Sequence, residues 1–175
     1  MNLIAYPFIH SIFSILEIQI FAMSLSPAKI NLFLLSKLPS AWLCGVRLKH
    51  MNEEEALVTV KHSWINQNPF NSMYFAVQAM AAELSTGALV MNKIRASDRK
   101  ISMLVANNKA TFIKKATGKI SFTCTNGKEI AAAIKESIKT GEGQTCWMQS
   151  VGVNEDGIAV SHWDFEWTVK VKGTR

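Results

Sequence analysis

Glu83 is the residue whose type and position point most directly to chemistry. It lies in residues 71–86, which lack Pro and Gly and are rich in Met, Ala, Gln, Glu and Leu, a composition that predicts a helix. Helical spacing puts Glu83 on one face with the small residues Ala76, Ala79 and Gly87. A carboxylate on an apolar helix is partly desolvated, which raises its pKa and suits it to act as a general base near neutral pH.

The start of the same helix supplies a second chemical group. Its first backbone N–H groups have no partner inside the helix and stand at the positive end of the helix dipole. The N–H groups of Phe75 and Ala76 are therefore the expected donors to a carbonyl oxygen that becomes an oxyanion. Asn68 and Ser72, just upstream, are candidates for positioning a water molecule or that carbonyl.

Each of these residues also has a structural interpretation. Glu83 could pair with a lysine or cap a neighbouring element, and buried carboxylates serve structure as well as catalysis. Asn68 precedes a proline and suits a turn, whereas Ser72 suits the N-cap of the helix. Tyr74 and Phe75 fit a core or a pocket wall. Catalysis and structure both remain open for this group.

The positive charge is concentrated in the middle of the chain. The net charge is +6, with five basic against five acidic residues over 1–86, eleven against three over 87–140, and three against five over 141–175. Such a block attracts polyanions of any kind, including nucleic acid, anionic lipid and the phosphates of coenzyme A. A solvated basic face is the structural alternative.

Several other kinds of site are excluded by the motifs. The chain has no Walker loop and no GxGxxG, and its histidines lack the HExxH spacing of zinc enzymes, so no metal or other cofactor is implied. The histidines of the strand patterns, His62 and His162, read as hydrogen-bonded structural residues. Three cysteines without a CxxC pair, Cys44, Cys124 and Cys146, fit buried thiols in a reducing cytoplasm.

Residues 1–22 differ in composition from the rest of the chain. The first 25 residues are strongly apolar and carry no Lys or Arg, whereas a secretory signal has a basic start. Glu17 would cost about 2.5–3.5 kcal/mol at the centre of a spanning helix. Ordinary sequence begins at Met23, so we expect 23–175 to form a single domain and 1–22 to be an extension from a misplaced start codon. A native N-terminal peptide beginning at Met1 would contradict this hypothesis.

Hydrophobic patterns and turn signals divide the first half of the domain. Residues 27–39 read as a short amphipathic helix that Pro39 ends. Its expected apolar stripe is Ile30, Phe33, Leu34 and Leu38. Alternation over 46–49 and β-branched residues over 56–61 predict a hairpin or one bent strand. The central helix should then end at Gly87.

The second half reads mainly as strands. The apolar residues 88–95 read as a buried strand, and 101–115 as a long strand that Asn107-Asn108 turns into a hairpin or a bulged strand. A strand over 118–125 and a helix over 126–140 follow. The last two strands are 144–153 and 158–171, joined through Asp-Gly. The buried face of the last strand is Trp163, Phe165, Trp167, Val169 and Val171.

The order of these elements and the stretch 68–83 resemble the hotdog fold, in which a curved sheet wraps a central helix. More closely, residues 40–172 resemble the phenylacetyl-CoA thioesterase-like branch and an uncharacterised subfamily beside it, to which the closing Trp163–Lys172 strand is similar. That branch has an Asn, a His-Gly-Gly helix start, and an acid fifteen positions after the Asn. Counting from Asn68 reaches Glu83, but Tyr-Phe-Ala stands where that branch has His-Gly-Gly.

The resemblance implies an α+β fold with a mostly antiparallel sheet of five to six strands around one long helix, plus accessory helices. It implies a homodimer or tetramer in which the helix start of one subunit faces the acid of the other. Glu83 would then activate water against an acyl-CoA thioester. The pocket candidates are Met73, Tyr74 and Met80, and the candidates for holding coenzyme A phosphates are Arg95, Arg99, Lys114 and Lys115.

Three functions follow as hypotheses. The first is a cytoplasmic acyl-CoA thioesterase, with no nucleic acid partner. The second is a non-catalytic hotdog protein that binds an acyl or other hydrophobic ligand, because Phe75 is bulky where close backbone approach favours Gly. The third is a membrane-surface protein held by residues 1–22. Thioester turnover by a Glu83→Ala variant separates the first two.

Overall fold

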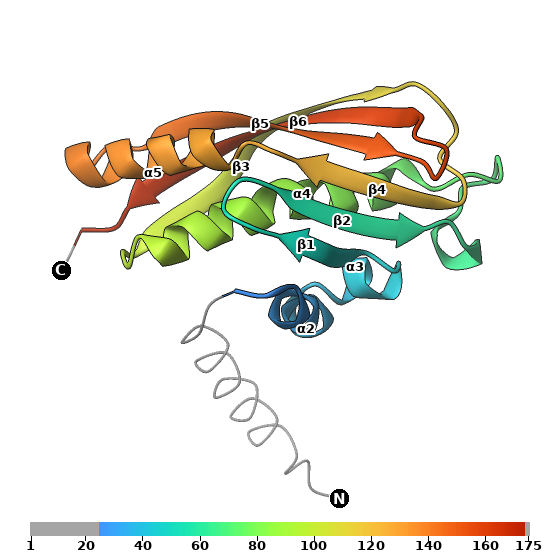
Figure 1. Cartoon of the computed structure of the whole chain (residues 1–175), viewed down its shortest axis with the longest axis horizontal. Coiled ribbons are helices and arrows are strands. Elements are labelled where there is room, and N and C mark those ends of the chain that lie inside the picture. The colour runs from blue at the N-terminus through green and yellow to red at the C-terminus, as the bar shows by residue number, and fades with distance from the viewer. Residues whose placement is uncertain (1–24, 174–175) are drawn as a thin grey trace, which may run out of the picture.

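The computed structural model describes residues 25–173, so the expectations for residues 1–22 lie outside it. Its centre is one antiparallel sheet of six strands in the order β1-β2-β4-β5-β6-β3, curved around the long helix α4 (Phe75–Ala96), as Figure 1 shows. The strands are β1 (Arg47–Met51), β2 (Ala56–Lys61), β3 (Ile101–Phe112), β4 (Lys119–Cys124), β5 (Gln144–Val153) and β6 (Ala159–Val171). The expected α+β architecture is confirmed.

The central helix is longer than its sequence indicated. It starts at Phe75, runs through Gly87 and ends at Ala96, so the predicted strand over 88–95 is wrong. Ala88, Leu89 and Val90 are all fully buried, because sheet and helices cover α4 on every side there. Apolar residues without a helical period resemble a buried strand in sequence. Gly87 is no cap: it lets α4 approach β6, since a Cβ atom there would lie 3.2 Å from Trp167 Cζ2.

Two choices that the sequence left open are settled. β1 and β2 form an antiparallel hairpin rather than one bent strand. β3 is one bulged strand rather than a hairpin, and the register shift falls between Val105 and Asn107.

The bulge changes which side chains of β3 face the helix. Before it, Val105 pairs with the inward-facing Trp167; after it, Asn108 pairs with Phe165 and Phe112 with Ser161. The inward positions therefore change from odd to even residue numbers. The second half of β3 is exposed on both faces, so its inner side is left uncovered near the start of α4.

The last two strands match their prediction. β5 pairs with β6 along the whole length of β5, and Gly157 with φ 77° lies in the connecting turn. Trp163, Phe165, Trp167 and Val169 on β6 are at most 4% exposed and form the inner wall, whereas Val171 at the end is partly exposed.

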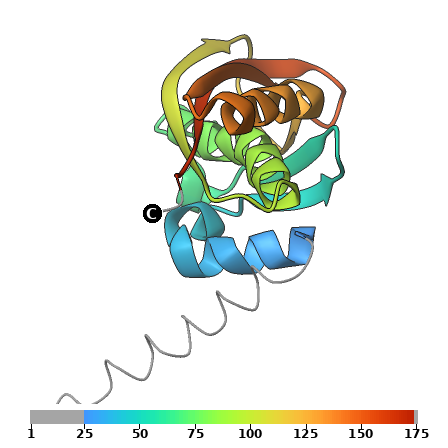
Figure 2. The same ribbon diagram turned by 90° about the vertical axis from the view of Figure 1, so that its left-hand side faces the viewer.

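The helix expected over 27–39 is present as α2 (Pro27–Lys37), and a second short helix, α3 (Pro39–Leu43), follows it. Figure 2 shows α2 beneath α4. Pro39 begins α3, because proline suits the first position of a helix. Leu38 leaves the helical conformation at φ −130° and is 43% exposed, so its place on the buried stripe is wrong. Within residues 25–173, no helix is long and apolar enough to cross a membrane.

The helix α5 (Gly127–Thr140) was predicted correctly, and it packs against α4, β5 and β6. Its first residue touches the turn between β1 and β2: Gly127 N–H donates to Glu54 O at 3.0 Å. A Cβ atom on Gly127 would lie 2.6 Å from Glu54 Cα, and backbone cannot rotate away as a side chain can.

We therefore expect Gly127→Ala to lower the free energy of unfolding by about 3 kcal/mol, measured by urea denaturation. Gly143→Ala is the matched control, because the nearest atom to its new Cβ is Lys170 Cδ at 4.0 Å. Equal unfolding midpoints for the two variants would contradict this packing.

Candidate active site

The start of α4 presents two backbone donors without acceptors. Tyr74 is the N-cap and makes no side-chain cap, while its N–H donates to Asn66 O at 2.8 Å. Val77 N–H and Gln78 N–H both donate to Tyr74 O, at 3.0 and 3.3 Å. The N–H groups of Phe75 and Ala76 donate to no residue within 25–173. They are free to bind a ligand oxygen, as an oxyanion site requires.

A hydrogen-bonded loop holds this helix start in place. Asn68 Oδ1 accepts from Phe70 N–H at 2.9 Å and from Ser72 N–H at 3.3 Å, and Asn68 Nδ2 donates to Ser72 Oγ at 3.0 Å. Asn68 thus closes a turn, as its position before proline suggested. The proposed N-cap role of Ser72 is wrong, because its hydroxyl is used by Asn68 and the helix begins at Phe75.

A hollow of about 560 Å³ opens at the helix start, between the loop and the segment that follows β3. Among its walls are the predicted residues Asn68, Ser72, Met73, Tyr74, Phe75, Lys114 and Lys115. The lining does not include Met80, Ala76 or Glu83. Met73 is buried and Tyr74 is 47% exposed, so the first forms the floor and the second the rim.

Gln78 is a site residue that the sequence did not single out. It lines the same hollow and is only 5% exposed. Its Oε1 accepts from Ser161 Oγ at 3.0 Å, and Ser161 Oγ accepts from Trp163 Nε1 at 3.0 Å. The sequence offered one signal for Gln78, an amide side chain within an otherwise apolar helical turn. A solvent-exposed position on the helix would explain a glutamine there equally well.

A run of aromatic rings leads from the helix start into the core. The ring centroids of Tyr74 and Phe75 are 5.0 Å apart, those of Phe75 and Phe112 6.4 Å, and those of Phe112 and Trp163 5.4 Å. Trp163 stacks on Phe165 at 6.1 Å. Phe75 and Phe112 are each about half exposed, so these two rings flank the mouth of the hollow. Phe112 reaches this position because of the bulge in β3.

Glu83 lies two turns further along α4 and is partly buried. Burial raises the pKa of its carboxyl above the ordinary value. Its carboxylate makes no ion pair or hydrogen bond with any residue that the structure describes, so the interpretation as a salt-bridge partner or cap is not supported. A Cβ atom on Gly87 would lie 3.2 Å from Glu83 Oε1, so the glycine leaves the carboxylate its space.

The packing around Glu83 fixes its position on the helix. Thr86 Oγ1 donates to Glu83 O at 2.9 Å and accepts from Trp167 Nε1 at 2.9 Å. These two hydrogen bonds connect the backbone at Glu83 to the centre of β6. The arrangement holds a desolvated carboxylate that has no competing partner among residues 25–173, which favours proton transfer.

Within one chain, the acid and the free N–H groups stand apart. From Ala76 to Glu83 is seven residues, or about 10 Å along the helix axis at 1.5 Å per residue. Glu83 is accordingly absent from the lining of the hollow at the helix start.

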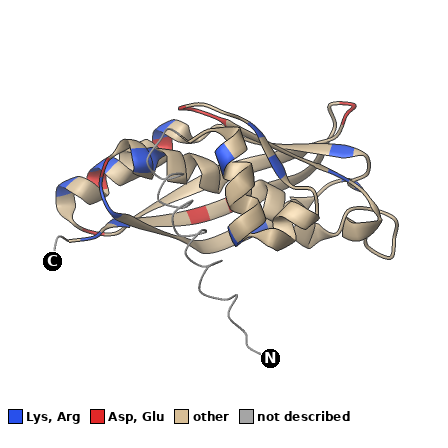
Figure 3. Cartoon of the chain, turned by 90° about the horizontal axis from the view of Figure 1, so that it is seen from below, with Lys and Arg blue, Asp and Glu red and all other residues tan. Residues whose placement is uncertain are grey.

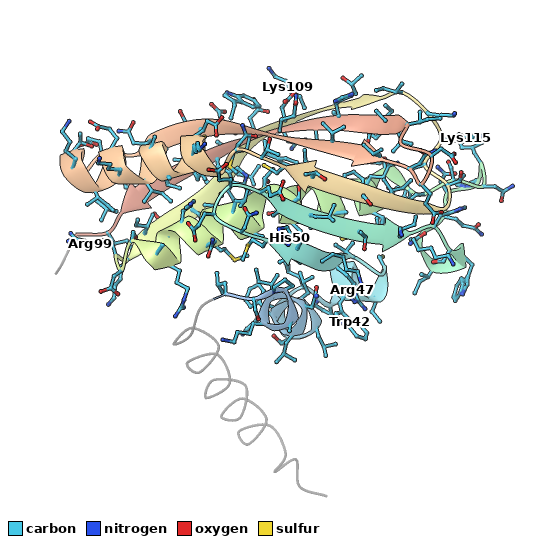
Figure 4. The ribbon with its side chains drawn as sticks, viewed as in Figure 1. Trp42, Arg47, His50, Arg99, Lys109 and Lys115 are labelled. Carbon is cyan, nitrogen blue, oxygen red and sulfur yellow. The ribbon has the colours of Figure 1, made fainter. Side chains whose placement is uncertain are left out.

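The four basic candidates separate into two pairs. Lys114 and Lys115 line the hollow at the helix start, where Lys115 Nζ donates to Phe70 O at 3.2 Å. Arg95 and Arg99 lie at the other end of α4, and Figure 4 shows Arg99 and Lys115 at opposite ends of the molecule. Figure 3 shows basic positions distributed over both ends rather than in one patch.

Cys124 and Cys146 are unsuited to nucleophilic chemistry. Cys124 is fully buried, and burial raises the pKa of its thiol to about 11. Burial also raises the pKa of the Cys146 thiol. Because the thiolate is the reactive form, both stay protonated near neutral pH. His62 differs from its predicted role as a hydrogen-bonded histidine, since its Nε2 is buried without a partner among the described residues.

A curved antiparallel sheet around one long helix defines the hotdog fold, and this chain has it. It belongs to the family described as a domain of unknown function, DUF4442, whose model matches residues 28–169. No match was found among curated proteins.

Solved structures share the fold at low sequence identity. A Pseudomonas aeruginosa protein of unknown function, called a probable thioesterase, is 18% identical and superimposes with a TM-score of 0.71, covering 84% of this chain and 97% of that one. A Chlorobaculum tepidum protein of unknown function is 15% identical, with a TM-score of 0.73 and coverage of 86% and 99%. A Haemophilus influenzae thioesterase is 12% identical, with a TM-score of 0.63 and coverage of 85% and 93%.

Proposed function

We propose that the protein hydrolyses thioesters of acyl-CoA or of a related acyl carrier, with Glu83 as the general base. The observation that carries this proposal is the carboxylate of Glu83, which is held on the central helix with a raised pKa and has no partner in the part of the chain that the structure describes. Similar folds in proteins named as thioesterases agree with it. The free thiols of Cys44, Cys124 and Cys146 fit a reducing, cytoplasmic setting.

The chemistry uses groups from two copies of the chain. Since Glu83 and the free N–H groups of one helix are about 10 Å apart along the axis, the acid of one subunit acts on a thioester held by the other. β3 is an edge strand whose outer side has no partner in the described chain, and Leu104 on it is 67% exposed. An unpaired edge with exposed apolar residues suits a second copy, and we propose a homodimer or tetramer.

The proposed reaction has two steps. Glu83 removes a proton from water, the resulting oxygen attacks the thioester carbonyl, and the oxyanion accepts hydrogen bonds from Phe75 and Ala76 N–H. The tetrahedral intermediate then releases the thiolate, which takes the proton from Glu83. Asn68 and Ser72 hold the loop that aims the two N–H groups. Met73 and Tyr74 form the acyl pocket beside them.

The phosphates of coenzyme A have two candidates near this site. Lys114 and Lys115 line the hollow into which the helix start points, so they are the cations we assign to the phosphates. Met80 packs against the core away from this lining, and it has no assigned contact with the substrate.

A binding protein without catalysis is the second candidate. It is favoured by Phe75, whose ring contacts Tyr74 and Phe112 at the mouth of the oxyanion site. These rings line the hollow beside the backbone N–H groups, and an acyl chain would pack well against them without reacting.

Release of free thiol from short-, medium- and long-chain acyl-CoA separates the two functions. We expect turnover by the natural protein and none above background by Glu83→Ala, with both proteins folded by circular dichroism. Retention of full turnover by Glu83→Ala would remove Glu83 from the mechanism. Absence of turnover with every thioester, together with saturable binding of an acyl-CoA, would support the binding protein.

Gly87→Ala tests the space around the carboxylate. The new methyl group would crowd Glu83 Oε1 and Trp167 Cζ2, each at 3.2 Å, so the carboxylate and the indole must shift by a few tenths of an ångström. We expect kcat to fall about tenfold or more, since a small displacement of a catalytic group is costly. Alanine also improves helix propensity by about 1 kcal/mol, so the melting temperature should change little. Unchanged kcat would show that Glu83 tolerates displacement and argue against its role.

A further inference from the structure

An apolar hollow lies at the end of α4 opposite the proposed active site. It encloses about 300 Å³ between α2, the last turns of α4 and the first residues of β3. Its apolar walls include Ile30, Phe33, Met91, Ile94 and Met103. Two of these are methionines, whose flexible side chains adapt to a ligand. None of its lining residues belongs to the hollow at the helix start.

A second, cationic hollow of about 530 Å³ adjoins the first, and the two share Ile94, Arg95 and Ile101. Its walls add Arg99, Lys100 and Lys172, against one acidic residue, Asp98. Arg99 and Lys100 are exposed, so their charged groups can reach a ligand at the surface, and Figure 4 shows the position of Arg99. The apolar hollow therefore opens beside a positively charged rim.

We propose that these two hollows form a binding site for a single-chain amphiphile with an anionic head. The chain lies in the apolar hollow among Ile30, Met91 and Met103, and a carboxylate or phosphate head meets Arg99 and Lys100. Apolar walls with a few charged groups at one end are what such a ligand requires, and the volume is at the lower end of known ligand sites. The site is separate from the proposed active site.

Charge selects this ligand over other occupants of the hollow. A neutral chain would fill the apolar part but leave the cations of the rim unused. If a second copy of this chain bound rim to rim, its Arg99 and Lys100 would lie close to the same two cations of the first copy. The like charges would repel each other. An anionic head satisfies both parts at once.

Calorimetric titration of the full-length protein with saturated carboxylates of eight, ten and twelve carbons tests whether the alkyl chain of the ligand occupies the apolar hollow. Below their micelle concentrations, each added methylene should tighten binding about fourfold until the hollow is full. The alcohol of ten carbons should bind at least tenfold more weakly than the ten-carbon carboxylate, since it lacks the charge. Decyl phosphate distinguishes the head, because tighter binding than decanoate assigns the rim to phosphate.

Two pairs of substitutions test the rim without disturbing the core. Arg99→Glu with Lys100→Glu should weaken decanoate binding at least tenfold. The control is Lys119→Glu with Lys135→Glu, which changes the net charge equally but lies outside both hollows and should leave affinity unchanged. Equal losses in both pairs would mean only general attraction and would overturn the site.

A further substitution tests the apolar hollow. Met103→Trp, on the partly exposed β3, should fill the hollow and lower affinity more for the twelve-carbon than for the eight-carbon chain. Three results would each overturn the proposal. They are no binding by the full-length protein, binding that does not depend on the length of the alkyl chain, and loss of binding in Phe112→Ala, a substitution at the helix-start hollow. These binding readouts do not depend on thioester turnover, so the proposed activity can fail without affecting them.

Discussion

Glu83→Gln should lower kcat for thioester hydrolysis by a factor of about 100 to 10,000 and at the same time raise thermal stability at neutral pH. The amide keeps the size of the side chain but cannot accept the proton of water, and a positioned general base contributes about that factor. The stability gain follows from burial, because the ionised carboxylate has no partner in the described chain to compensate its desolvation.

The pH dependence of the stability shows whether the ionised carboxylate of Glu83 stabilises or destabilises the folded protein. The folded protein holds the Glu83 proton to a higher pH than the unfolded chain does, because burial raises the pKa in the folded state. The stability contributed by Glu83 is therefore fully present below the pKa of the unfolded chain and is lost as pH rises through the folded pKa. We expect the melting temperature of Glu83→Gln to exceed that of the natural protein above that range and to converge with it in acid.

Glu142→Gln is the matched control, since Glu142 is exposed and 3.9 Å from Lys170. It should leave both kcat and the melting temperature nearly unchanged, as expected for a weak surface pair. A Glu83→Gln protein that keeps its kcat, or that melts below the natural protein at pH 8, would contradict the assignment of a desolvated, unpartnered base.

Trp167→Ala should lower the free energy of unfolding by about 3–5 kcal/mol, the range for large-to-small changes of buried aromatic residues. Trp167 is 3% exposed at the centre of β6, and its Nε1 donates to Thr86 Oγ1. The substitution leaves a cavity beside Gly87 and removes the link that ties the backbone at Glu83 to the sheet. Urea denaturation measures the change.

Trp147→Ala provides the comparison on the other face of the sheet. Trp147 is 42% exposed, and its ring contacts Lys109 at 4.8 Å. Losing an exposed cation–π contact costs about 0.5–1 kcal/mol. Similar losses for the two tryptophans would mean that Trp167 is not part of the core.

The sequence predicted those parts of the fold in which one face of an element is buried. Residues of β6 alternate between apolar and polar, so its inner face could be predicted from Trp163 onward. The second half of α4 could not be predicted, because Ala88, Leu89 and Val90 are buried whatever direction they face. Gly87 then looked like a helix end, although its role is to let α4 approach Trp167.

The placement of Glu83 on the central helix was predictable, because it depends on spacing within one segment of chain. The first helical residue was not, since the helix begins at Phe75 and not at residue 71. The contact between Phe75 and Phe112 was not predictable, since it depends on how β3 pairs with β6 across the bulge. The environment of Gln78 depends in the same way on Ser161 from a distant strand. Long-range packing decides these positions, and no local pattern encodes it.

The bulge in β3 also decides how the mouth of the helix-start hollow responds to a deletion. Val105 and Phe112 both face inward because one extra residue lies between their two registers. Deleting Ala106 from the gene would remove that extra residue and leave regular alternation, with Phe112 still opposite Ser161 and beside Trp163. Losing one codon would thus straighten β3 and leave the ring of Phe112 at the mouth of the hollow.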